Sequence, residues 1–251
     1  MISEFPLFVF TTFAGIAAGS YAVSLFFPVR RDGAGKPWAF PLLMLALLAI
    51  GLIGCLLHLQ HPERFLNALF NPAAGITLEA YFSIALGVVL VADVLCCVLR
   101  GSCPKWLRAV GAAAALLLAF VMGYAYSISF GVTAWASPIS VLLFLVGDVA
   151  MGAGLCAALS YGDGPSRALS LTVAVASAAF AVSSACEGVL FAGLGIGAAP
   201  QVVACALSLF AAVLGFAAKK AKPHTVAACQ CASIVIAVCV ARYAFYAACT
   251  F

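Results

Sequence analysis

Continuous apolar runs of about 20 residues alternate with short polar segments along the whole chain. Each run is long enough to cross a hydrocarbon core of about 30 Å as an α-helix, at about 1.5 Å per residue. The runs lack the strict alternation, over about 10 residues, of membrane β-strands. Eight spans are therefore predicted, at 6–28, 38–59, 78–99, 109–131, 139–161, 168–192, 201–218 and 225–249. Because the connections are short, helices adjacent in sequence are expected to pack as antiparallel neighbours in a single domain, 1–251.

The composition excludes a soluble domain of this size. Of the 251 residues, 66% are hydrophobic and only 8% are charged, whereas a water-soluble fold needs a large polar surface. In lipid the backbone must satisfy its own hydrogen bonds, so the fold class is an all-α integral membrane protein with eight transmembrane helices. The 11 cysteines form no CxxC pair and are interpreted as small packing residues.

Basic residues are concentrated on one side of the predicted bundle. The loops after the first, third, fifth and seventh spans contain Arg30, Arg31, Lys36, Arg100, Lys105, Arg108, Arg167, Lys219, Lys220 and Lys222. The other two basic residues are Arg64, on the opposite side, and Arg242, inside the last span. Because cytoplasmic loops carry an excess of Lys and Arg, both termini are predicted to lie outside.

Ionisable and phenolic side chains gather near the outer ends of the predicted spans. These residues are His58, Glu79, Tyr124, Tyr126, Glu187 and Arg242. Ionisable groups at membrane depth are costly and indicate function by default. The set suits oxidation of a quinol, which releases two protons and two electrons. An imidazole and a carboxylate can accept and relay the protons, a guanidinium can stabilise negative charge, and phenols can hydrogen-bond and stack.

The charged candidates also have structural alternatives. Thr77 and Glu79 can be the N-cap and first-turn acid of the third span. Glu187 and Arg242 can form an interhelical ion pair. His58 can simply end the second span at the interface.

The remaining polar residues of the spans have similar alternatives. Tyr124, Tyr126 and Trp135 can belong to an aromatic belt at the membrane surface. Asp93 and Asp148 are interpreted as structural. A belt or a cap does not explain why opposite charges cluster on one side, so the clustering favours a functional site.

A haem within the chain is not expected. His58 and His61 lie at the same end of one span, and His224 lies on the other side of the membrane, so two axial histidines on facing helices are missing. The sequence also contains no phosphate-binding loop and no dinucleotide fingerprint. Electrons that leave a quinol here must therefore pass to a partner protein.

Two other functions remain open at this point. Glu79, Asp93, Asp148 and Glu187 can line the path of a small-solute or ion transporter. Transporters usually place their sites near the midplane and often contain inverted repeats, which this sequence does not show. The other alternative is a purely structural anchor that binds no quinone.

Two short motifs resemble the membrane-anchor subunit of the dimethyl sulfoxide reductase family. The first, HLQHPERFLNAL from His58 to Leu69, is followed by Glu79. The matching residues are His58, Leu59, Pro62, Arg64, Asn67 and Glu79. Gln60 stands where the family usually has Gly. The second motif, ARYAFY at 241–246, is similar to a family ending that has Gly at the position of Ala241.

The resemblance implies a quinol-oxidising anchor in the plasma membrane of a prokaryote. In such anchors menaquinol is the bound substrate, and the family's essential histidine and glutamate match His58 and Glu79. The resemblance makes Arg64, Tyr124, Arg242 and Tyr246 neighbours of that site. The implied partners are an iron–sulfur subunit with four clusters, docked on outer loops near Arg64 and Asn67, and a molybdopterin-containing reductase that determines the terminal acceptor.

Overall fold

The computed structural model of the chain describes residues 4–29, 36–59, 65–160, 162–217 and 223–250. Its helices are α1 (Phe5–Ser24), α2 (Ala39–His58), α3 (Phe65–Ala68), α4 (Gly75–Arg100), α5 (Lys105–Ser127), α6 (Pro138–Ala158), α7 (Arg167–Gly193), α8 (Ala199–Ala217), α9 (Pro223–Ala247) and the 3-10 helix η2 (Ala248–Thr250). Eight of these helices, all except α3 and η2, are long and apolar enough to cross a membrane. The described residues contain no strand, so the predicted all-α fold class is confirmed.

Helix boundaries follow local capping chemistry. α6 begins with Pro138 after Ser137, whose hydroxyl accepts a hydrogen bond from the Ile139 amide at 3.2 Å. α4 ends at Arg100 and is followed by Gly101, whose φ of 73° places it in the left-handed region that favours glycine. The short helix α3, between α2 and α4, was not predicted, because four residues are too few to show helical periodicity.

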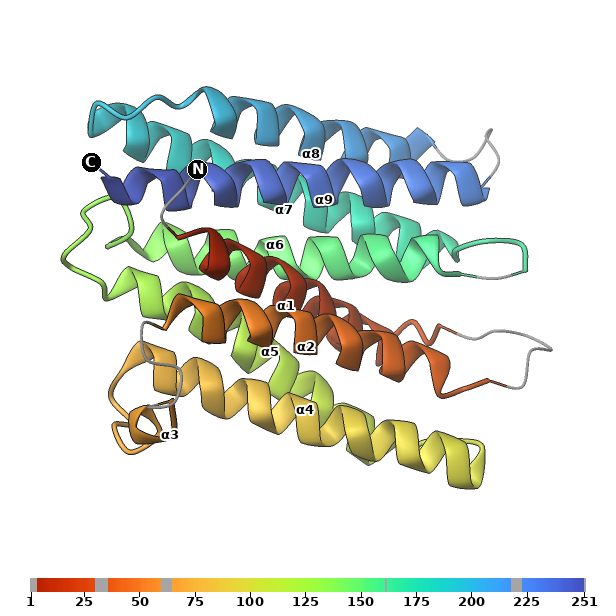
Figure 1. Cartoon of the computed structure of the whole chain (residues 1–251). Coiled ribbons are helices and arrows are strands. Elements are labelled where there is room, and N and C mark those ends of the chain that lie inside the picture. Colours follow the sequence, from red (N-terminus) through yellow and green to blue (C-terminus); the bar gives the residue numbers. More distant parts are fainter. Residues whose placement is uncertain (1–3, 30–35, 60–64, 161, 218–222, 251) are drawn as a thin grey trace.

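Helices adjacent in sequence pack against each other, as predicted. α1 is central, because it contacts α2, α5, α6 and α9 (Figure 1). Both termini lie at one end of the bundle, called the terminal end here (Figure 1). The opposite, basic end carries the described residues Lys36, Arg100, Lys105 and Arg167.

α1 and α6 approach each other at glycines. A Cβ atom at Gly19 would overlap the backbone of Asp148, and a Cβ atom at Gly152 would overlap the backbone of Gly19. A Cβ atom at Gly15 would overlap the Asp148 carboxyl group. Small residues allow membrane helices to pack backbone to backbone, so these glycines determine how closely α1 lies beside α6.

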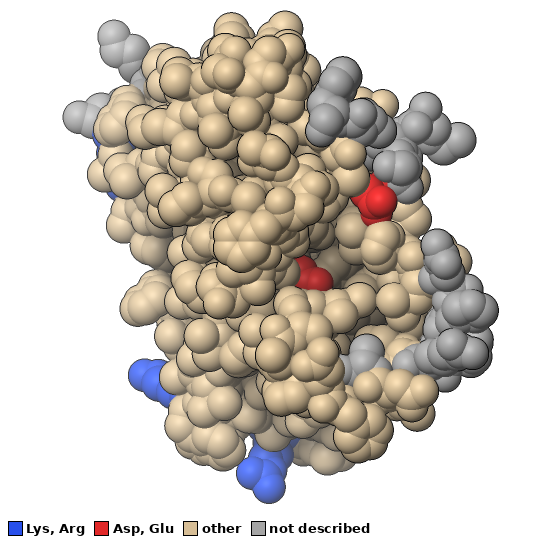
Figure 2. Space-filling view, turned by 90° about the vertical axis from the view of Figure 1, so that its left-hand side faces the viewer, with Lys and Arg blue, Asp and Glu red and all other residues tan. Residues whose placement is uncertain are grey.

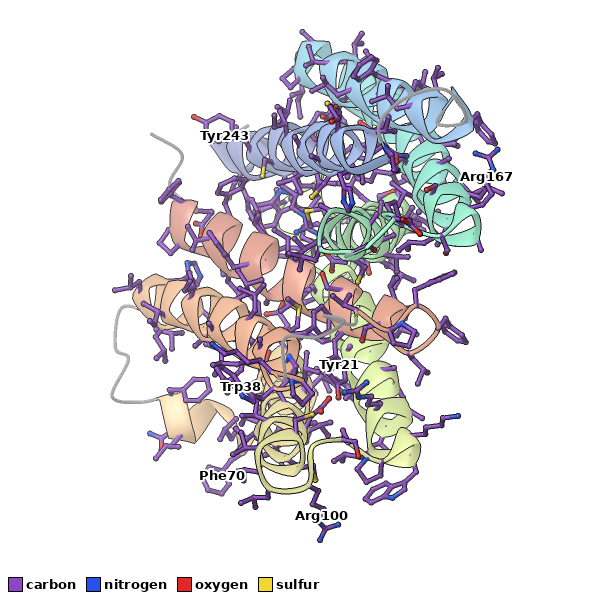
Figure 3. The ribbon with its side chains drawn as sticks, turned by 90° about the vertical axis from the view of Figure 1, so that its right-hand side faces the viewer. Tyr21, Trp38, Phe70, Arg100, Arg167 and Tyr243 are labelled. Carbon is purple, nitrogen blue, oxygen red and sulfur yellow. The ribbon has the colours of Figure 1, made fainter. Side chains whose placement is uncertain are left out.

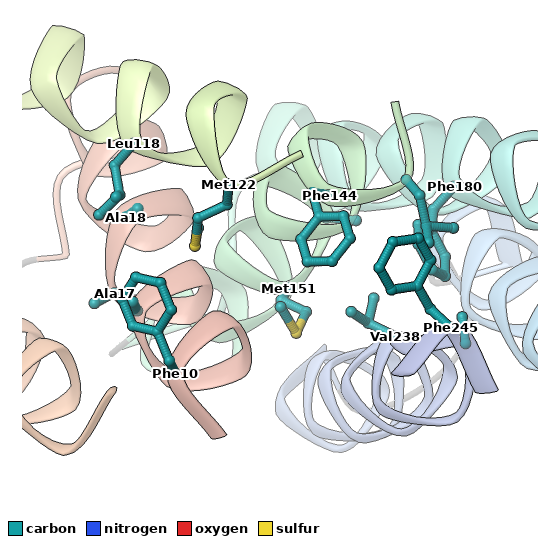
Figure 4. Close-up of a cluster of buried hydrophobic side chains, with 14 of the residues drawn as sticks. Phe10, Ala17, Ala18, Leu118, Met122, Phe144, Met151, Phe180, Val238 and Phe245 are labelled. Atoms are coloured by element: carbon teal, nitrogen blue, oxygen red, sulfur yellow. The ribbon is translucent and has the colours of Figure 1, made fainter. Parts of the chain in front are cut away.

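Large apolar side chains fill the space around this crossing. Phe10 of α1, Met122 of α5 and Met151 of α6 are almost fully buried in one cluster (Figure 4). Phe144 and Phe245 continue the cluster towards α9, with ring centroids 5.2 Å apart. The aromatic side of this core surrounds the polar residues of the terminal end.

Candidate functional site

Glu79 is a buried carboxyl group in the second turn of α4. Its side chain is 5% exposed, and its Oε1 atom has no hydrogen-bond partner among the described residues. α4 begins at Gly75 after Ala74, so Thr77 is not the N-cap and Glu79 is not in the first turn. The capping alternative for Glu79 is therefore wrong. A buried, unpartnered carboxyl oxygen is expensive, which marks it as a place where a hydrogen-bonding ligand would be stabilised.

Three buried hydroxyl groups form a chain at the same end of the bundle as this carboxyl group. Tyr246 of α9 donates to the Tyr126 hydroxyl of α5 at 2.8 Å, and its oxygen lies 3.1 Å from the Thr11 hydroxyl of α1. Glu79 lies close enough to act electrostatically on both phenols. The chain therefore joins the terminal ends of α1, α5 and α9 within electrostatic range of the unpartnered carboxyl group.

Aromatic rings hold the two phenols in place. Tyr126 packs against Trp135, Phe144 and Phe245 with ring centroids 5.2 to 5.3 Å apart. The Trp135 indole donates to the Phe245 carbonyl at 2.7 Å. Tyr126 and Trp135 are thus buried inside the bundle, and the belt alternative is wrong for both.

Tyr124 is the one phenol of the predicted belt that faces outward. Its side chain is 38% exposed and stacks on Phe120 of the same helix, with ring centroids 6.0 Å apart. The structure therefore does not bring Tyr124 together with Tyr126, two residues further along α5, because successive residues of a helix point in different directions.

Arg242 is paired with Asp148, and the predicted alternative pair with Glu187 is wrong. The guanidinium lies 2.5 Å from the Asp148 carboxylate and donates to the Thr11 carbonyl at 2.6 Å. It also lies over the Phe144 ring, 4.7 Å from the centroid. Both charged side chains are fully buried. Arg242 therefore makes its contacts inside the bundle, between α1, α6 and α9.

Glu187 has a neutral partner instead of a cation. Its Oε2 atom accepts a hydrogen bond from the Gln201 side-chain amide at 2.6 Å, across α7 and α8. The same amide lies 3.5 Å from the Ala241 carbonyl of α9, and Ser184 donates to the Gln201 carbonyl at 3.1 Å. Glu187 thus belongs to a polar contact among α7, α8 and α9, separate from the phenol chain.

His58 lies at the last residue of α2, with its side chain 34% exposed. Its Nδ1 atom is 2.9 Å from the Oε2 atom of Glu4. Cys55, one turn earlier on α2, lies within electrostatic range of Glu79. The imidazole therefore lies at the rim of the terminal end, one helical turn from Cys55. Arg64, the remaining predicted site residue, lies outside the described residues.

The surface of the terminal end is hollowed. Figure 2 shows two acidic side chains on this face, one of them recessed in a hollow, whereas basic side chains appear only at the periphery. The acidic residues described at this end are Glu4, Glu79 and Glu187. This face therefore combines a surface opening with acid–base groups, as a ligand site near the membrane surface requires.

A second polar cluster lies at the basic end. Asp93 accepts a hydrogen bond from the Tyr21 hydroxyl at 2.8 Å and from the Cys97 thiol at 3.2 Å. The Arg108 guanidinium lies 3.3 Å from the same carboxylate. Figure 3 shows Tyr21 among the helix ends, whereas Arg100 and Arg167 project outward. Asp93 is thus well partnered, in contrast to Glu79 at the other end of the bundle.

Fold and site together define a multi-pass helical membrane protein with a buried acid–base cluster at one end. In the described part of the chain, no group of three or more metal-ligating side chains that could hold a metal ion occurs. The sequence profile of the DMSO reductase anchor subunit (DmsC) family matches residues 1–195, and the chain belongs to this family. No curated protein sequence matches the chain.

Family membership makes the chain the membrane anchor of a DMSO reductase-type complex, associated with catalytic and iron–sulfur subunits. The matched region contains His58, Glu79 and Tyr126 but ends before α8 and α9. Arg242 and Tyr246 therefore lie outside the matched region.

Proposed function

We propose that the anchor oxidises menaquinol at the terminal end and passes the electrons to an iron–sulfur subunit with four clusters. The unpartnered Glu79 oxygen, buried within electrostatic range of the phenol chain, is the observation that carries this proposal. From the partner, the electrons continue to a molybdopterin-containing reductase in anaerobic respiration.

The distribution of charge supports an outward-facing site. The basic end would face the cytoplasm, because Lys and Arg are retained there, and the terminal end would face the outside of a prokaryotic plasma membrane. A lipid-soluble quinol then reaches Glu79 from the outer leaflet, close to water that can accept the released protons.

Each residue of the site has a distinct role in the proposal. Glu79 accepts a hydrogen bond from one quinol hydroxyl and takes up its proton. Tyr126 accepts the hydrogen bond of Tyr246, so its own hydroxyl proton can be donated to a ring oxygen of the quinol. His58 takes the second proton and releases it to water at the rim. Oxidation removes two protons and two electrons, and the electrons leave through the partner.

Matched substitutions test the proposal in membranes that contain the assembled complex. Glu79→Gln and His58→Gln keep side chains of similar size but remove the proton acceptors. Each is expected to lower menaquinol turnover by about 10²–10⁴-fold, the range for loss of a general base. Reduction of the terminal acceptor with a reduced viologen dye, which bypasses the quinol, should stay unchanged.

Asp163→Asn is the control, because Asp163 is exposed in the loop before α7. If both Gln variants oxidise menaquinol at the wild-type rate, the anchor has no quinol chemistry at this site. The chain would then act as a structural anchor.

A further inference from the structure

Glu4 and His58 face each other at the rim of the terminal end. The carboxylate Oε2 atom lies 2.9 Å from the imidazole Nδ1 atom, and the two side chains are 20% and 34% exposed. The two atoms are at ion-pair distance, and the Oε2 atom has no hydrogen-bond partner among the described residues. The contact joins the start of α1 to the end of α2.

Glu4 is placed at a helix N-terminus but does not cap it. It is the N-cap residue of α1, where acidic side chains commonly accept hydrogen bonds from backbone amides. Its carboxylate makes no capping hydrogen bond, and Pro6 removes one of the amide donors in the first turn. The carboxylate is therefore directed at His58, and helix capping does not explain its position.

A close helix contact fixes the two side chains relative to each other. Gly54 lies one turn before His58 on α2, and a Cβ atom there would come within 2.8 Å of the Pro6 carbonyl and 3.0 Å of the Phe10 amide. The first turn of α1 thus rests directly on the last turns of α2. Glu4 and His58 are held together by backbone packing as well as by their own contact.

From this geometry we infer that Glu4 is a positioning residue for His58, an inference that rests on the proposed quinol oxidation. A lone pair on Nδ1 would be repelled by the carboxylate beside it, so the negative charge favours the tautomer with the proton on Nδ1. The Nε2 atom then keeps its lone pair and becomes the base. A carboxylate that orients a histidine and selects its tautomer is a recurring arrangement in catalysis.

The proton transfer balances within the site. A quinol O–H bond breaks, an N–H bond forms at His58 Nε2, and the electron pair stays on the quinol oxygen until the electrons leave to the iron–sulfur partner. The imidazole then carries a positive charge, which the adjacent Glu4 carboxylate offsets. Because the imidazole is one-third exposed, water at the rim can remove the proton.

The tautomer is measured by ¹⁵N NMR on the full-length, histidine-labelled chain in lipid bilayers. The chain has three histidines, and a His61→Gln background leaves the signals of two. His224 is an internal reference of the opposite type, because its Nε2 atom lies 2.9 Å from the Gly162 carbonyl and must carry the proton there. His58 is expected to carry its proton on Nδ1, and Glu4→Met to move that proton to Nε2.

Turnover in the assembled complex tests the consequence of the tautomer. Glu4→Met should lower the kcat for menaquinol by about tenfold, less than loss of the base itself, while KM changes less than twofold. Glu4→Gln keeps an acceptor oxygen and should retain most of the turnover. In a His58→Gln background, Glu4→Met should cause no further loss, because the two residues act as one unit. Asp163→Met is the matched control.

The outcomes separate the inference from the proposed function. Wild-type turnover and an unchanged His58 tautomer in Glu4→Met, with His58→Gln inactive, would overturn the role of Glu4 and leave quinol oxidation intact. Wild-type turnover in His58→Gln would instead overturn the proposed function. Reduced viologen activity shows in each case whether the complex has assembled.

Discussion

Arg242 and Asp148 form an ion pair across α9 and α6 in which neither side chain is exposed. The pair is incompletely satisfied, because Asp148 Oδ2 and Arg242 Nε have no partner among the described residues. Through Thr11, which accepts from Arg242 with its carbonyl and contacts Tyr246 with its hydroxyl, the pair is joined to the phenol chain. Charge pairing inside the bundle and the candidate site are therefore one connected network.

Removing one partner of this pair should destabilise the protein strongly. Arg242→Gln or Asp148→Asn leaves one buried charge uncompensated, which typically costs about 3–5 kcal/mol. Thermal unfolding of the purified chain in detergent measures the loss. The double variant Asp148→Asn/Arg242→Gln should be more stable than either single variant. Equal stability of all four proteins would show that the pair is not formed.

Substituting the glycine at the α1–α6 crossing should prevent close packing. Gly152→Ala places a Cβ atom against the backbone of Gly19, which no side-chain movement can relieve. We expect a marked fall in the yield of folded protein, judged by size-exclusion chromatography in detergent. Gly87→Ala is the matched control, because its Cβ atom would be 3.7 Å from Leu48 and Ala is the better helix former. Similar yields of the two variants would contradict the close crossing.

Removing the Tyr246 hydroxyl should weaken the site without unfolding the bundle. Tyr246→Phe loses its contacts with Tyr126 and Thr11, at about 1 kcal/mol each. Menaquinol turnover should fall by about tenfold, less than the roughly 10²–10³-fold lost with a donor that touches the reacting atoms. Tyr243→Phe, one turn away and 47% exposed, is the control. If both variants behave alike, the phenol chain has no part in turnover.

Cys103, in the turn between α4 and α5, should resist alkylation. Burial raises the pKa of its thiol to about 12, and Asp93 adds to the shift. Since the thiolate is the reactive form, labelling at pH 8 should be about 10²-fold slower than for an ordinary thiol, after allowing for the greater nucleophilicity of a more basic thiolate.

The raised pKa of Cys103 also predicts how its labelling rate changes with pH. Below pH 12 the Cys103 thiol is mostly protonated, so labelling should rise about tenfold for each pH unit. The exposed neighbour Ser102, changed to cysteine in a Cys103→Ser background, should instead level off near pH 8.5. Iodoacetamide labelling of single-cysteine variants, followed by mass spectrometry, measures both rates. Equal rates at pH 8 would contradict the raised pKa of the partly buried Cys103 thiol.

The eight membrane helices could be predicted because apolar length is a local property of the sequence. The sequence could not show which buried acid pairs with Arg242. The sequence places Glu79, Asp148 and Glu187 all at membrane depth, and the choice depends on the rotation of each helix about its axis. That rotation follows from packing, including the glycines that bring α1 beside Asp148.

Two residues of the terminal end, Thr11 and Glu4, could not be identified as part of the site from the sequence. Thr11 is a hydroxyl residue in an apolar span, where it usually bonds its own backbone, and it does so here with Leu7 at 3.0 Å. Glu4 precedes the first predicted span and looks like an ordinary polar flank. The useful signal was their position along the predicted bundle, because Thr11 and Glu4 lie within two turns of the same end as His58 and Glu79.

The contact of Gly19 with α6 also bears on the route of the quinol in the proposed function. An isoprenoid tail could not pass between α1 and α6 where their backbones touch, so it would have to enter between other helices. α2 and α4 are less tightly joined at Gly87, and they carry His58 and Glu79. Bulky residues placed along that seam would then slow long-tailed quinols while sparing short, water-soluble ones.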